Sequence, residues 1–68
     1  MIKIKDLKSK QRIWHERHGE NAIYTVCGDP FEMLLTGKWA VETKNEGGFC
    51  WVFYEVDEQY IHLELEEK

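Results

Sequence analysis

The feature that most constrains the fold of this chain is an aromatic run that follows two glycines. Residues 47–56 read Gly-Gly-Phe-Cys-Trp-Val-Phe-Tyr-Glu-Val. Side chains of a β-strand point alternately to its two faces, so Phe49, Trp51 and Phe53 share one face and Tyr54 lies on the other. Neither face is polar before the glutamate. We therefore expect a strand that packs its three-ring face into the core and is covered, or binds something, on its other face.

Other segments carry the same period-two signal. Residues 38–43 alternate apolar and polar side chains, and the loop 44–48 joins them to the aromatic strand as a hairpin. Residues 22–27 are rich in β-formers and end at a Gly-Asp-Pro stop. Residues 60–65 alternate again after a tight turn at 57–59. These four segments are predicted strands.

The first part of the chain is less distinctive. Residues 2–5 alternate like a short strand, and residues 11–17 are predicted to form another strand. A helix over residues 6–17 is the alternative, because its apolar residues also fall at roughly helical spacing. Such a helix would be largely polar with one narrow apolar stripe, which favours the strand.

Residues 29–37 carry the sequence signals of a short helix. Asp29 suits the N-cap, Pro30 the first helical position and Gly37 the C-cap. We therefore predict a helical turn near residues 30–36, with a loop and an irregular strand as the alternative. A helix of about two turns is unstable unless it docks on the rest of the protein. The side chains available for docking are Phe31, Leu34 and Leu35.

Five strands of five to eight residues, in a chain too short for two sheets of normal size, favour one small antiparallel barrel. The tight hairpin between the third and fourth strands, and the short turn before the fifth, resemble the SH3-like barrel superfold. This resemblance rests on spacing and implies a fold without a function. The predicted fold class is therefore mainly β, as a single domain over residues 1–68. A compact α+β domain is the alternative.

The distribution of charge and the cysteine content indicate which kinds of partner and which cellular compartment to expect. Residues 1–19 hold six Lys and Arg against two acids, whereas residues 20–68 hold three Lys against eleven acids. Such polarity is not typical of a broad nucleic-acid surface, which needs a concentrated basic face. No apolar run is long enough to span a membrane, and the first residues lack a signal-peptide core. With only two cysteines, the predicted localisation is cytoplasmic.

No residue pattern points to catalysis, to a cofactor or to a metal site. The three histidines and two cysteines lack the short paired spacing of zinc ligands. Nothing in the sequence places a histidine beside Cys27 or Cys50 to activate a thiol. The chain is also short for a cleft that encloses a substrate. We therefore expect a protein that is not an enzyme.

The nine aromatic residues exceed what a small barrel can bury, so some should be exposed and available to a protein partner. The predicted partner-binding residues are Trp14, Tyr24, Tyr54, Glu16 and Glu55, with the two acids favouring a partner that carries Lys or Arg. The predicted function is a small cytoplasmic protein-interaction module of a phage-like or mobile-element type. Three alternatives stay open: an acidic decoy that inhibits a nucleic-acid-binding protein, a weak nucleic-acid binder through the basic N-terminal segment, and a homodimer that pairs strand edges.

Overall fold

A computed structural model describes residues 2–64 of the chain. The elements, in chain order, are η1 (Ile4–Asp6), β1 (Arg12–His15), β2 (Ile23–Val26), β3 (Phe31–Glu32), β4 (Trp39–Asn45), β5 (Cys50–Tyr54), η2 (Glu55–Tyr60) and β6 (Ile61–Leu63). All pairings between strands are antiparallel. The prediction of a mainly-β antiparallel fold is confirmed, and the helical elements of the described residues are two 3-10 turns.

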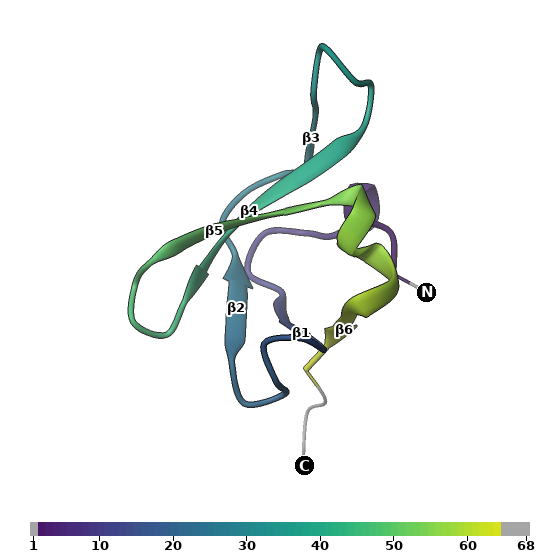
Figure 1. The fold of residues 1–68 in the computed structure, drawn as a ribbon. Coiled ribbons are helices and arrows are strands. Elements are labelled where there is room, and N and C mark those ends of the chain that lie inside the picture. Colours follow the sequence, from purple (N-terminus) through teal and green to yellow (C-terminus); the bar gives the residue numbers. More distant parts are fainter. Residues whose placement is uncertain (1, 65–68) are drawn as a thin grey trace.

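The strands follow the order β3–β4–β2–β1–β6, and β5 pairs with the opposite edge of β4 (Figure 1). β4 is the longest strand and the centre of the sheet. Its first residues pair with β3 and its last ones with β2, while β5 runs along its other side. The β4–β5 hairpin and the turn η2 before the last strand match the two features that suggested an SH3-like fold. Closure of the sheet into a barrel stays a prediction.

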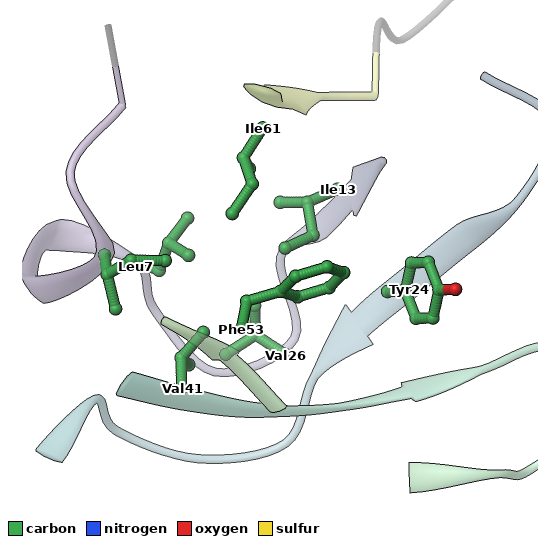
Figure 2. Packing of buried hydrophobic residues seen from close by; sticks show 8 residues of the cluster. Leu7, Ile13, Tyr24, Val26, Val41, Phe53 and Ile61 are labelled. Atoms are coloured by element: carbon green, nitrogen blue, oxygen red, sulfur yellow. The ribbon is translucent and has the colours of Figure 1, made fainter. Parts of the chain in front are cut away.

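The core lies between the strands, η1 and η2. Its buried cluster consists of Ile4, Leu7, Ile13, Tyr24, Val26, Val41, Phe53 and Ile61. The ring of Phe53 extends into the middle of this cluster (Figure 2). β1, β2, β4, β5 and β6 each contribute at least one buried side chain to this cluster, whereas both residues of β3 are exposed. A domain of this size buries only about 60% of the surface of its unfolded chain, so each of these side chains matters for stability.

Of the two strands predicted in the first part of the chain, one differs from the structure and one is confirmed. Residues 2–5 do not form a strand, because the 3-10 turn Ile4–Asp6 places Ile4 and Leu7 on one side of the chain, where both are buried. Residues 11–17 do contain a strand, β1, so the helix over 6–17 was the wrong alternative. The last strand ends at Leu63, and residue 65 of the predicted strand lies outside the described residues.

The predicted helix near residues 30–36 is also wrong. Residues 31–32 are extended against β4, and the N–H of Met33 donates to the carbonyl of Lys38 at 2.8 Å. The N–H of Gly37, which has a φ of +68°, donates to the carbonyl of Met33 at 2.8 Å and closes the turn. Pairing with β4 thus supplies the backbone hydrogen bonds that an isolated two-turn helix could not hold. The result is a hairpin that projects from the body of the domain (Figure 1).

The aromatic face of β5 is only partly buried. Phe53 is 1% exposed, but Trp51 is 48% exposed and Phe49 is 74% exposed. Phe53 packs on the core, whereas Phe49 lies just before β5, in the loop of the β4–β5 hairpin. The expectation that all three rings pack into the core is therefore wrong for Phe49 and half right for Trp51.

Candidate functional site

Two of the predicted partner-binding residues meet on the outer face of β1 and β6. The ring of Trp14 stacks on the ring of His62, with centroids 4.5 Å apart and planes inclined by 24°. His62 Nε2 lies 2.7 Å from a carboxylate oxygen of Glu16. Trp14 pairs with His62 across the two strands, which explains the stack. Trp14 and Glu16 are therefore joined through His62, which was considered as a metal ligand but was not among the predicted partner-binding residues.

A shallow groove of about 600 Å³ lies beside this stack. Its lining includes Trp14, Ile23, Leu63, Glu20, Glu46 and Glu64. Arg12 pairs with Glu64 at 2.6 Å, which raises the pKa of the guanidinium and lowers the pKa of that carboxyl through a charged hydrogen bond. Most of the groove's remaining charge is negative, so it suits a basic side chain.

Tyr24 occupies a different environment from the one predicted for it. Its ring is buried, and it meets the ring of Phe53 edge-on at 5.1 Å. Its hydroxyl oxygen lies 2.9 Å from Nδ1 of His18, and the two atoms form a hydrogen bond. Tyr24 is a core residue with a polar end, and it offers no exposed ring to a partner.

Tyr54 and Glu55 lie at the junction of β5 and η2. Tyr54 has an exposed ring, but a carboxylate oxygen of Glu55 accepts the N–H of Trp39 at 2.8 Å. The next acids along η2 act in the same way. Asp57 accepts the N–H of Tyr54 at 3.0 Å, and Glu58 accepts the N–H of Ile4 at 2.7 Å. The three carboxylates of η2 therefore bind backbone amides and hold the β4 start, η1 and η2 together.

His15 is the buried polar residue at the centre of this region. Its Nδ1 accepts the N–H of Arg17 at 3.1 Å, so the ring proton lies on Nε2, which faces Asp57 at 3.3 Å. Both ring nitrogens are occupied by structural contacts. This arrangement orients the β1–β2 loop and leaves His15 no lone pair for a substrate.

Within residues 2–64, no group of three or more His, Cys, Asp or Glu side chains is arranged to hold a metal ion. Cys27 and Cys50 are both exposed and unpaired. In the same part of the chain, neither helical turn reaches the length and apolarity of a membrane-spanning helix.

The tip of the β3–β4 hairpin is the most exposed apolar feature. Leu34 and Leu35, which we call the hairpin tip, are 102% and 100% exposed. Both leucines were expected to dock the predicted helix on the rest of the domain. Adjacent residues can belong to one apolar face of a helix, so the sequence holds no signal against that docking.

The ring of His18 packs against a group of aromatic rings that consists of His15, Tyr24, Trp51 and Phe53. Its ring meets Trp51 edge-on at 5.0 Å and stacks on His15 at 4.8 Å. Partial burial of the exposed His18 side chain against these rings, followed by the electrostatic effect of the neighbouring His15, lowers the pKa of His18 below its usual 6.5, while Asp57 opposes this shift.

This shift predicts a loss of stability in mild acid. The unfolded chain, with the higher His18 pKa, takes up the proton first. The free energy of unfolding should therefore keep its full value above pH 6.5. It should decrease as the pH falls from 6.5 toward the lower folded-state pKa of His18. Urea unfolding at several pH values between about 7.5 and 5, above the ordinary pKa values of carboxyl groups, measures this decrease. His18→Asn should flatten this pH dependence, and an unchanged slope in that variant would assign the effect to another group.

No protein-family model, curated protein or solved structure matches this chain. The site must therefore be interpreted from its own geometry.

Proposed function

We propose that this domain is a small non-enzymatic protein-interaction module and that the hairpin tip enters an apolar pocket of its partner. The carrying observation is the complete exposure of Leu34 and Leu35 at the end of a projecting hairpin. Folding gains nothing from two leucines in this position, where turns ordinarily carry Gly, Asn or Asp. Burial of both in a partner would contribute about 3–6 kcal/mol.

The charges beside the tip define the character of the contact. Glu32 and Lys38 flank the turn with opposite charges, so they give the tip no net charge. Binding through the tip should therefore depend little on salt. An acidic decoy would instead lose affinity steeply as salt rises. The decoy is the weaker proposal, because the carboxylates of Glu55, Asp57 and Glu58 are engaged with backbone amides.

A second contact is proposed at the groove beside Trp14 and Glu16. The carboxylate of Glu20 and the half-buried indole of Trp14 would accept a Lys or Arg of the same partner, whereas Glu46 and Glu64 already pair with Arg12. Tyr54 remains a candidate contact because its ring is exposed. We further propose a cytoplasmic setting, which two unpaired cysteines support. The phage-like or mobile-element origin also remains a proposal.

The test compares Leu34→Ser/Leu35→Ser with Val56→Ser, an exposed apolar residue outside the hairpin. A photo-crosslinking residue at position 34 identifies the partner, and affinity is then measured with each variant. We expect the double variant to bind at least about tenfold more weakly, because two buried leucines are lost. The Val56 variant should bind normally. Both should keep the wild-type melting temperature within a few degrees. Unchanged affinity in the double variant would contradict the proposal.

A further inference from the structure

The strand β5 has an open hydrogen-bonding edge. Within residues 2–64 it pairs with β4 alone. Asn45 N–H donates to the carbonyl of Phe49 at 2.9 Å, which sets the phase of the β4–β5 ladder. Hydrogen-bonded and non-bonded pairs then alternate, so Cys50 and Val52 direct their N–H and C=O groups away from β4. The Glu42 carbonyl, opposite Val52, agrees with this phase because it accepts from the N–H of Cys27, which directly follows β2 on the other side of β4.

This edge lacks the usual protection against pairing. Natural edge strands carry Lys, Pro or a bulge that discourages another strand. Residues 49–54 contain no charged residue and no proline in a chain that is 32% charged, and the β4–β5 register runs without interruption from Lys44–Cys50 to Ala40–Tyr54. The side chains of Phe49 and Trp51 are largely exposed along the strand. The open amides and carbonyls specify a β-strand as the ligand, and the neutral side chains specify an uncharged one.

We infer that β5 pairs in antiparallel fashion with β5 of a second copy, about a two-fold axis at Trp51. In this register Cys50 of one copy exchanges two hydrogen bonds with Val52 of the other, and the reverse pair does the same. All four outward groups of Cys50 and Val52 are then satisfied in both copies. The N–H of Tyr54, which already donates to Asp57, takes no part. A register centred on Val52 would instead require that N–H.

The side chains fit the same register. Trp51 lies opposite its own copy in a non-bonded pair, where side chains approach most closely, and Phe49 lies opposite Phe53. Both exposed rings gain cover, and no like charges meet along the strand. Each copy has one such β5 edge, so pairing is closed at two copies. Because Ala40 pairs with Phe31 on one side and Tyr54 on the other, the hairpin of β3 lies across β4 from this interface and stays free.

Sedimentation of the 8.2 kDa chain over about 10 µM to 1 mM tests the dimer, since a single-strand interface is expected to be weak. The mass should rise toward twice the monomer value. Val52→Pro removes an outward N–H that the monomer does not use, and Trp51→Lys places like charges opposite each other. Both variants should stay monomeric, whereas Val56→Lys should behave like the wild type. A wild-type mass that stays at 8.2 kDa, or dimers of both β5 variants, would overturn the inference.

Cysteine crosslinking tests the register in a Cys27→Ser background. Val52→Cys should form a disulfide with Cys50 of the other copy, because hydrogen-bonded pairs have Cα atoms about 5.5 Å apart. Val52→Cys combined with Cys50→Ser should give no covalent dimer. A covalent dimer of that second variant would place position 52 opposite itself and overturn the register centred on Trp51.

Discussion

Phe53→Ala should remove most of the stability of this domain. Phe53 is 1% exposed and meets the rings of His15, Tyr24 and Trp51. Truncation of a buried phenylalanine to alanine costs about 3–5 kcal/mol through lost burial and the cavity that remains. A domain of this length has about 3–10 kcal/mol in total. The variant should therefore be partly or wholly unfolded at physiological temperature.

Phe49→Ala is the matched control for this prediction. It makes the same substitution one residue before β5, on the same face by sequence, but Phe49 is 74% exposed. Its cost should stay within about 0.5 kcal/mol. Urea unfolding followed by circular dichroism, at concentrations low enough to keep β5 unpaired, compares the two. Similar losses in both variants would mean that the core extends along the whole strand.

The contrast between Phe49 and Phe53 shows what alternation can predict. Period-two patterning identified the β2, β4 and β5 strands because it reports which face a side chain occupies. It does not report how far the core extends along that face. Trp51 and Phe49 follow the correct alternation but lie progressively beyond the core. Burial at a strand end depends on the neighbouring elements, which a single sequence does not place.

The hairpin and η2 illustrate a second limit. Capping residues at 29–37 predicted a helix because local signals cannot weigh pairing with β4, which lies later in the chain. From the sequence, Glu55 was expected to contact a partner, and no role was predicted for Asp57 or Glu58. Glu58 instead binds the backbone of Ile4, fifty-four positions away, and Glu55 binds that of Trp39. These partners are set by the tertiary fold. For the same reason the sequence could not show that, of two predicted contact residues, Tyr54 is exposed and Tyr24 is buried.

Asp57→Ala should produce the largest loss among the η2 acids. One carboxylate oxygen of Asp57 accepts the N–H of Tyr54 at 3.0 Å, and the other faces the Nε2 proton of His15 at 3.3 Å. Alanine leaves the buried imidazole N–H without a partner, at about 1–3 kcal/mol. Loss of the bond to the Tyr54 amide at the start of η2 adds about 0.5–2 kcal/mol. We expect a loss of about 2–4 kcal/mol in urea unfolding.

Asp57→Asn separates the two contacts. Its side-chain oxygen can accept only one of the two N–H groups, while its NH₂ group faces the other donor. The loss should therefore lie between the wild type and Asp57→Ala. In a His15→Phe background Asp57→Ala should cost less, because the imidazole N–H that alanine leaves unpaired is then absent, while the phenyl ring keeps a ring against Phe53. Strict additivity of Asp57→Ala and His15→Phe would show that the imidazole and the carboxylate do not interact, and that Asp57 acts only on the Tyr54 amide.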